Sequence, residues 1–177
     1  LKRLDVMYND FVIIGPKLDP AGIRASADVT AALQKIAAFQ APFLSRGDDS
    51  GTHKAEKKLW TATGIDVAAA SGSWYREAGL GMGATLMMST AMNAYTLSDR
   101  ATWISFARKG NQDVLFSGDL RLFNQYGVIA VNPARHPHVN ALGAEQFVDW
   151  ITGPKGQAEI AAFKIGDEQL FFPNAAR

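Results

Sequence analysis

The chain has 177 residues, of which 47% are hydrophobic and 20% are charged, and its formal net charge is +1. This composition is typical of a globular protein of one domain or of two small lobes, and the near-neutral charge argues against nucleic acid as a partner. The absence of cysteine excludes disulfides, a thiol nucleophile and a cysteine-bearing zinc site. No apolar run approaches the roughly 20 residues that a membrane-spanning helix needs.

The first part of the chain predicts alternating strands and helices. The patterns behind this are apolar runs that stop at turn residues, capping residues before amphipathic stretches, and a glycine after the last helical turn. The predicted elements are, in order, a strand at 6–15 that ends at Gly15-Pro16, a helix capped by Asp28 or Ser26 that runs to about Phe39, a short strand at 42–45, and a helix at 50–63 that ends at Gly64.

The second part continues the alternation. Its predicted elements are a short helix at 74–78 ("WYREA"), a helix at about 84–93, a strand at 94–97, a capped helical turn at 98–106, strands at 113–116 and 123–132, and helices at about 143–152 and 155–164. Such alternation is typical of an α/β protein with largely parallel pairing. The similar strands 6–15 and 123–132 could be paired crossovers between two lobes.

The segment "SRGDDSGT", residues 45–52, carries the clearest chemical signal, and we call it the arginine loop. It leads from a strand into a helix, whose first turn offers unpaired N–H groups and the positive end of a dipole. Glycine lets an anion approach that backbone, hydroxyl side chains add donors, and Arg46 adds a planar cationic fork. These features describe a site for a small oxyanion. The candidate donors of the loop are Ser45, Arg46, Ser50, Gly51 and Thr52.

Two simpler interpretations stay open at this point. The loop could be an ordinary helix start, with Asp49 or Ser50 as the cap and Arg46 paired with Asp48. The glycine cluster "GLGMG", which includes Gly81 and Met82, could be a second helix-terminus anion site or only a flexible turn. As a dinucleotide fingerprint it fails, because its spacing is wrong and a predicted helix precedes it.

The sequence gives little support to an enzyme or to a metal site. It contains no Gly-x-Ser-x-Gly elbow, no Walker loop, and no histidine placed to activate a serine. His136 and His138 have metal-ligand spacing, but they have no third ligand nearby and lie in a proline-containing loop. We therefore expect no catalytic residue, no metal and no cofactor.

Several blocks in order resemble the tungstate- and molybdate-binding proteins of bacterial ABC transporters. "FLSRGDDSGTHKAE" resembles the anion loop of that family, and "DVMYNDFVIIGPKLDPAGI" resembles its first crossover strand. "YREAGLGMGATL", "AYTLSDRATW" and "FNQYGVIAVNP" follow in the family's order, so the resemblance covers essentially the whole chain. It implies the type II periplasmic binding fold, with an oxyanion ligand and a transporter permease as partner.

The resemblance also implies a site and a domain division. The oxyanion would lie between two lobes and accept hydrogen bonds from Arg46 and Thr52, with Ser45, Ser50, Gly51, Gly81 and Met82 nearby and Tyr95 lining the cleft. Residues 1–16 would end the first lobe and form a hinge strand, 17–122 would form a second α/β lobe, and 123–177 would be the return strand and the C-terminal helices of the first lobe. The location would be periplasmic or extracytoplasmic, with a lipid anchor conceivable in the full-length form.

One family feature has no counterpart in this chain. Family members begin with a Thr/Ser-rich anion loop, usually Thr-Thr-Thr-Ser, and nothing of that kind lies upstream of residue 6. The two C-terminal helices also offer little sheet for a complete first lobe. We therefore expect this chain to lack the N-terminal part of that lobe.

The loop leaves the identity of the anion open. Tungstate and molybdate are fully deprotonated near neutral pH and only accept hydrogen bonds, whereas phosphate keeps a proton that a carboxylate can accept. Phosphate-binding proteins of ABC transporters have a similar Arg-Ser-Asp-Gly-Ser-Gly-Thr loop. A carboxylate of Asp48 or Asp49 that points toward the ligand would favour phosphate, whereas carboxylates that point away would favour tungstate or molybdate. Other hypotheses are a ligand-sensing domain of a transcription regulator and a phosphate-ester hydrolase.

Overall fold

The computed structural model describes residues 2–176, which form two compact units. The central unit is Asp10–Phe123, and the terminal unit comprises the chain up to Asn9 and from Asn124 onward. Strand β1 (Leu4–Pro16) belongs to both units, and the chain returns to the terminal unit at the start of β6 (Phe123–Val128). The predicted domain boundaries, after residues 16 and 122, stay a prediction.

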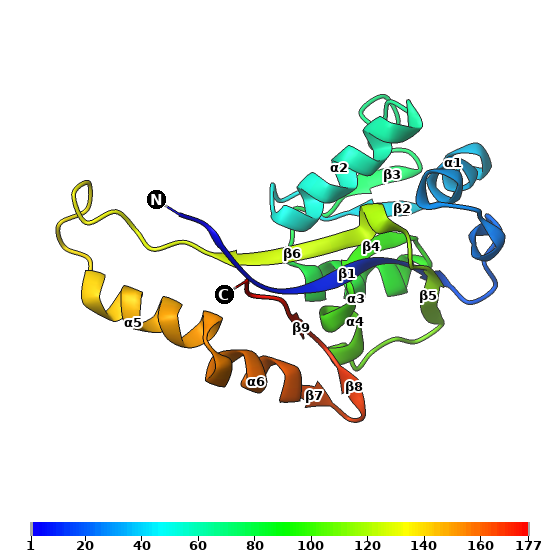
Figure 1. Ribbon diagram of the computed structural model, residues 1–177. Helices are drawn as coiled ribbons and strands as arrows, with labels where there is room; N and C mark the ends of the chain where they lie inside the picture. Colours follow the sequence, from blue (N-terminus) through cyan, green and yellow to red (C-terminus); the bar gives the residue numbers. More distant parts are fainter. Residues whose placement is uncertain (1, 177) are drawn as a thin grey trace. The chain divides into compact units, whose positions relative to one another are not determined.

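The elements of the central unit largely follow the predicted order (Figure 1). Asp28 caps α1 through the backbone N–H of Ala31, as predicted, and Gly64 ends α2 in the left-handed conformation. The elements between β1 and β6 are η1 (Ile23–Ala25), α1 (Val29–Phe39), β2 (Phe43–Ser45), α2 (Gly51–Thr63), β3 (Tyr75–Glu77), α3 (Met82–Met92), β4 (Thr96–Asp99), α4 (Arg100–Ser105), β5 (Gln112–Phe116) and η2 (Leu120–Leu122).

The prediction of largely parallel pairing is wrong for half of the central sheet. β2 and β3 pair in parallel, and a parallel bridge between Phe43 and Tyr95 joins β2 to the start of β4. β1, however, runs antiparallel to both β4 and β5. Alternating strands and helices impose parallel pairing only where a helix carries the chain from one strand to the next, and β1 enters the unit without such a crossover. The sheet is therefore mixed.

The predicted helix at 74–78 is also wrong, because residues 75–77 form strand β3. Gly72 and Gly79 lie on either side of it with φ of 82° and 65°, which limits the segment to a short extended run. Within that run Tyr75 pairs with Phe43, and the two rings stack with centroids 5.8 Å apart. Pairing with the free edge of β2 therefore outweighs the helical propensity of "WYREA".

Helices cover both faces of the central sheet. Phe11 and Ile13 of β1 belong to one cluster of buried side chains, which includes Ile36 of α1 and Trp60 of α2. Their neighbours along the strand face the opposite side, since side chains alternate across a strand. There a second cluster brings α3 and α4 against the sheet. Its members are Val12, Ile14, Met82, Leu86 and Trp103.

The terminal unit contains the end of the chain and the first part of β1 (Figure 1). β6 and β9 both pair with β1, and the rings of Tyr8 and Phe172 stack at 5.3 Å. Gln157 ties α6 to β1 by donating to the carbonyl of Val6 (2.9 Å). Its remaining elements are α5 (Ala141–Thr152), α6 (Pro154–Ala162), β7 (Lys164–Ile165), β8 (Glu168–Gln169) and β9 (Phe172–Pro173), so the two predicted C-terminal helices are confirmed. Between residues 2 and 176, no helix is long and apolar enough to cross a membrane.

Candidate functional site

The arginine loop connects the carboxyl end of β2 to the amino end of α2. Ser50 is the N-cap of α2, and its Oγ accepts a hydrogen bond from the backbone N–H of His53 (3.2 Å). In return, the imidazole Nδ1 of His53 accepts from the backbone N–H of Asp49 (3.0 Å), which has a φ of 57°. These reciprocal bonds fix the loop where it enters the helix. Ser50 therefore caps the helix, as one of the two simpler interpretations predicted, and its hydroxyl oxygen is occupied by this hydrogen bond.

Arg46 lies within the loop with most of its side chain buried. Its Nη2 donates to Asp48 Oδ2 at 2.5 Å, and 17% of the arginine side chain is exposed. The Nε of Arg46 is buried and has no hydrogen-bond partner among residues 2–176. A guanidinium carries five N–H donors, so the ion pair with Asp48 leaves donors for a ligand. The Arg46–Asp48 ion pair of the simpler interpretation is therefore present, but it does not use all the N–H donors of Arg46.

Both carboxylates of the loop are engaged with cations. Asp48 accepts from Arg46 and from the backbone N–H of Ser50, and the Ser50 side chain, together with Arg46, lowers its pKa to about 2. Asp49 extends into solvent with 84% of its side chain exposed, and its carboxylate lies 3.5 Å from Lys54 Nζ. The charges of both acids are thus met by neighbouring cations, and the lowered pKa of Asp48 keeps that carboxyl ionised near neutral pH.

The first turn of α2 presents donors that the protein itself does not use. Gly51 is exposed, and a Cβ added there would meet no atom within 4 Å. Within the described residues, the backbone N–H groups of Gly51 and Thr52 and the hydroxyl of Thr52 make no hydrogen bond with protein. Such groups at the positive end of a helix favour an anion.

A second helix terminus lies beside the first because β2 and β3 are parallel. Their carboxyl ends meet at one edge, where Leu80 N donates to the carbonyl of Arg46 (3.2 Å). Gly47 packs so closely on β3 that a Cβ there would lie 2.8 Å from the Cβ of Glu77. The N-cap of α3 is Gly81, which is exposed and has no side-chain cap. Ligands of α/β proteins bind at this kind of edge.

Three of the predicted site residues have side chains in the interior. Ser45 is fully buried and donates to Glu56, so its hydroxyl supports the loop from below. Tyr95 is also fully buried; its hydroxyl donates to Asp19 Oδ1 (2.8 Å) and accepts from Ala21 N (3.0 Å). Met82 is 7% exposed and packs in the second buried cluster. Tyr95, which was expected to line a cleft, has its ring in the buried core of this structure.

Glu56, a buried carboxyl that contacts the loop, is absent from the site residues predicted from the sequence. Both of its oxygens accept hydrogen bonds from hydroxyl groups at 2.7 Å, one from Ser45 and one from Tyr75. A signal was present, because Glu56 precedes Leu59 and Trp60 by three and four residues and so shares their buried face. Among the charged residues of "HKAEKKLW" this acid looks like part of a solvated surface.

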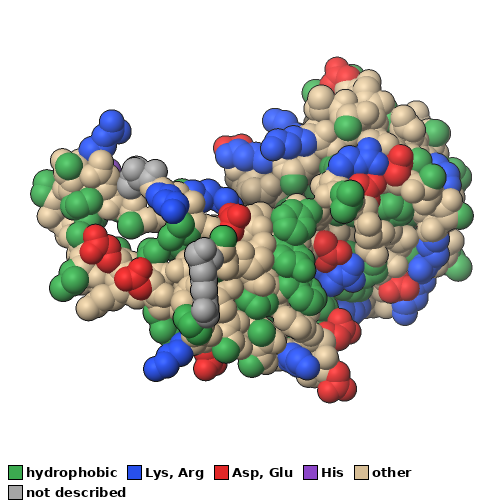
Figure 2. All heavy atoms as spheres, in the orientation of Figure 1, with side chains coloured by type: hydrophobic (Ala, Val, Ile, Leu, Met, Phe, Trp, Pro, Cys, Tyr) green, Lys and Arg blue, Asp and Glu red, His purple; other side chains and the backbone are tan. Residues whose placement is uncertain are grey.

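Exposed lysines cover the outer face of α2. Lys54, Lys57 and Lys58 are all exposed, and Figure 2 shows basic side chains gathered over this helix. They lie in the first two turns, close to the arginine loop along the helix. A positive surface of this kind attracts an anion over a distance of about a Debye length, roughly 8 Å at physiological salt.

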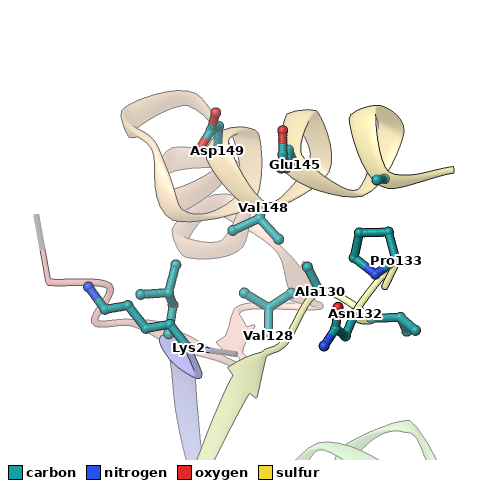
Figure 3. Close-up of a pocket in the computed structure, with 11 residues that line it drawn as sticks. Lys2, Val128, Ala130, Asn132, Pro133, Glu145, Val148 and Asp149 are labelled. Carbon is teal, nitrogen blue, oxygen red and sulfur yellow. The ribbon is translucent and has the colours of Figure 1, made fainter. Parts of the chain in front are cut away.

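A separate cavity of about 470 Å³ lies in the terminal unit. Val128 of β6 and Val148 of α5 face each other across it (Figure 3). Its charged lining residues are Lys2, Glu145 and Asp149, so acids outnumber bases. A cavity with this charge balance does not suit a small dianion. The described part of the chain also contains no group of three or more His, Cys, Asp or Glu that could hold a metal ion.

Comparisons with known proteins agree on one superfamily. Residues 1–155 match the family model of the PBP superfamily domain. The tungstate-binding protein TupA of Peptoclostridium acidaminophilum is 45% identical over 100% of this chain, and the chain spans 62% of that relative's length. The solved tungstate binding protein TupA from Desulfovibrio alaskensis G20 is 44% identical over 99% of this chain and 71% of its own, with a TM-score of 0.81. A solved tungstate ABC transporter protein from Geobacter sulfurreducens is 48% identical over 92% of this chain and 68% of its own, with a TM-score of 0.82.

Proposed function

This chain belongs to the PBP superfamily domain family, and we propose that it captures tungstate as the substrate-binding part of an ABC transporter. The observation that carries the proposal is the likeness to tungstate-binding proteins over almost the whole chain, which includes the arginine loop. The proposal makes the chain a binding component without catalysis or cofactor. Its partner would be a transporter permease, and its location extracytoplasmic.

We assign the ligand contacts to the donors that the protein leaves unused. Arg46 would bind the oxyanion through Nε and a second N–H of its fork, while Asp48 keeps Nη2. Thr52 would contribute its hydroxyl and, with Gly51, the backbone amides of the first turn of α2. The amides after Gly81 would add the second helix terminus.

The remaining predicted residues would act indirectly. Ser50 would preserve the helix start through its cap, and Ser45 would hold the loop from below through its bond to Glu56. The Met82 side chain would anchor α3 in the core and leave only its backbone amide to the ligand. Tyr95 has no place in this set of contacts.

The engaged carboxylates support a fully deprotonated anion over phosphate. Phosphate keeps a proton near neutral pH and gains from an acceptor, but Asp48 is bonded to Arg46 and Ser50, and Asp49 is turned to solvent and Lys54. A set of donors without a free acceptor suits tungstate or molybdate. Burying a phosphate proton without a partner would cost about 1–3 kcal/mol.

The test is a calorimetric titration of this chain with tungstate, with competition by molybdate, sulfate and phosphate. We expect tungstate or molybdate to bind and phosphate to compete weakly. Preferred binding of phosphate would overturn the choice of anion and require a carboxylate of the loop to face the ligand. Absence of heat and of competition with all four anions would refute the proposed function for this chain.

A further inference from the structure

Glu56 connects three segments beneath the arginine loop. It is 2% exposed, and its two oxygens accept from Ser45 Oγ at the end of β2 and from the Tyr75 hydroxyl at the start of β3. Ser45 Oγ in turn accepts a hydrogen bond from the backbone N–H of Gly47 (3.2 Å). A chain of hydrogen bonds therefore runs from the buried carboxyl into the loop between Arg46 and Asp48.

The same carboxyl lies close behind the proposed ligand donors on α2. Glu56 follows Thr52 by four residues, so the two side chains share one face of the helix, with Cβ atoms about 5–6 Å apart. A dianion held by Thr52 and the first amides of α2 would face the carboxyl across one helical turn. Two negative groups at that separation, one of them shielded from water, repel each other strongly unless one becomes neutral.

We propose that Glu56 is a positioning residue for the arginine loop and that binding of the dianion draws one proton from solvent onto its carboxylate. This inference rests on the proposed function of the loop. The neutral acid keeps one oxygen as an acceptor and gains an O–H donor, so it can remain bonded to both hydroxyl groups. The connection to Gly47 thus survives while the buried negative charge is removed.

The surroundings of Glu56 are consistent with a proton that is easily gained. Burial raises the pKa of Glu56 to about 7, although the bonds from Tyr75 and Ser45 offset part of the shift, and Glu77 of β3 raises it further. Other titratable and charged groups of these elements have partners of their own: His53 of the same helix accepts from Asp49 N, and Arg46 pairs with Asp48 in the loop. The helix α1, packed against α2, brings Lys35, whose ammonium is exposed and bonded to the carbonyl of Gly22.

The proposal predicts a pH profile with a definite sign. Below the pKa of Glu56 in the free protein the group is already neutral, so affinity is independent of pH. Above it each anion must bring a proton, so affinity falls, by up to tenfold per pH unit for one linked proton. We expect tungstate to bind roughly 25-fold more weakly at pH 8.5 than at pH 6.5, a range in which tungstate itself stays a dianion.

The experiment is calorimetry with tungstate between pH 6.5 and 8.5 in pairs of buffers that differ in ionisation enthalpy. The wild type should take up close to one proton per anion near pH 8. Glu56→Gln should abolish the uptake and flatten the profile. The matched variant Glu77→Gln should keep the uptake, because it removes the neighbouring carboxyl and leaves Glu56 in place.

The possible failures are distinct. Wild-type binding without proton uptake would overturn the role of Glu56 and leave the proposed function intact, and this holds even if Glu56→Gln does not fold. Uptake that persists in Glu56→Gln would also overturn it by placing the proton elsewhere. Absence of tungstate binding at every pH would refute the proposed function and this inference with it.

Discussion

Replacement of Arg46 by alanine tests the proposed site most directly. In the structure Asp48 uses the Nη2 of Arg46, and the buried Nε has no partner within the described chain, so the side chain can offer two further N–H donors. Hydrogen bonds to charged groups contribute about 1.5–3 kcal/mol each. Loss of two should weaken tungstate binding by at least about 3 kcal/mol, which is roughly 150-fold.

A second consequence follows from the ion pair with Asp48. Arg46→Ala leaves that carboxylate without its cation, while the hydrogen bonds from Ser50, the largest cause of its lowered pKa, remain and keep it ionised beside the incoming dianion. Arg46→Ala/Asp48→Asn should therefore bind more tightly than Arg46→Ala alone. Arg46→Lys keeps the charge but loses the planar fork, so its affinity should lie between those of the wild type and the alanine variant.

The assay is calorimetry at pH 7 and constant ionic strength, with circular dichroism to show that each variant is folded. The four proteins of the cycle, wild type, two single variants and the double variant, give the coupling between Arg46 and Asp48. An Arg46→Ala protein that binds tungstate within tenfold of the wild type would refute the assignment of the arginine to the ligand. The Arg46–Asp48 pair would then be a structural element of the loop alone.

Three further predictions follow from the loop and its support. Thr52→Ala should lose about 1–2 kcal/mol of tungstate affinity in calorimetry while Thr52→Ser stays near the wild type; no loss in the alanine variant would leave the hydroxyl without a ligand role. Gly47→Ala should lower the free energy of unfolding in urea by about 1–3 kcal/mol, because φ is 61° and the new Cβ would lie 2.8 Å from that of Glu77. Gly22→Ala, with a similar φ of 67° and open space around it, is the control and should cost less. Glu56 has a pKa raised from 4.5 to about 7 by folding, so its stabilising contribution is complete below pH 4.5 and disappears as the pH rises through 7. Relative to Glu56→Gln, the wild type should lose up to about 3 kcal/mol of unfolding free energy over that range, and parallel pH profiles would contradict the prediction.

Local signals in the sequence determined much of the fold. Asp28 and Ser50 act as caps and Gly64 ends a helix as predicted, because these roles depend on the residue and its immediate neighbours. The predicted α/β, type II periplasmic-binding-protein fold is confirmed by the superfamily match and the solved relatives. The errors at β3 and in the strand directions concern features that depend on partners distant in sequence. Tyr75, for example, belongs to a strand because it pairs with the edge of β2.

In the candidate site, too, the features set by neighbouring residues were predicted and those set by distant partners were not. The sequence identified the loop by residue type, because arginine, hydroxyls and glycines before a helix are informative without knowing what surrounds them. It could not tell that Ser45 and Tyr95 are buried, because helices cover both faces of the sheet and side chains on either face then lie in the interior. It missed Glu56 because acids on a lysine-rich helix are usually solvated, and only the hydroxyls of Ser45 and Tyr75 make its burial possible.

The charges around the loop explain why the two proposals belong together. Asp48 and Asp49 already have cationic partners in Arg46 and Lys54, and the hydrogen bonds from Ser50 and Arg46 lower the pKa of Asp48. Glu56 differs because its hydrogen-bond donors within residues 2–176 are the neutral hydroxyls of Ser45 and Tyr75, and it is removed from water. Protonation of Glu56 therefore breaks no ion pair. The site can thus bind a dianion through hydrogen-bond donors while Asp48 and Asp49 keep their cationic partners and Glu56 gains the proton.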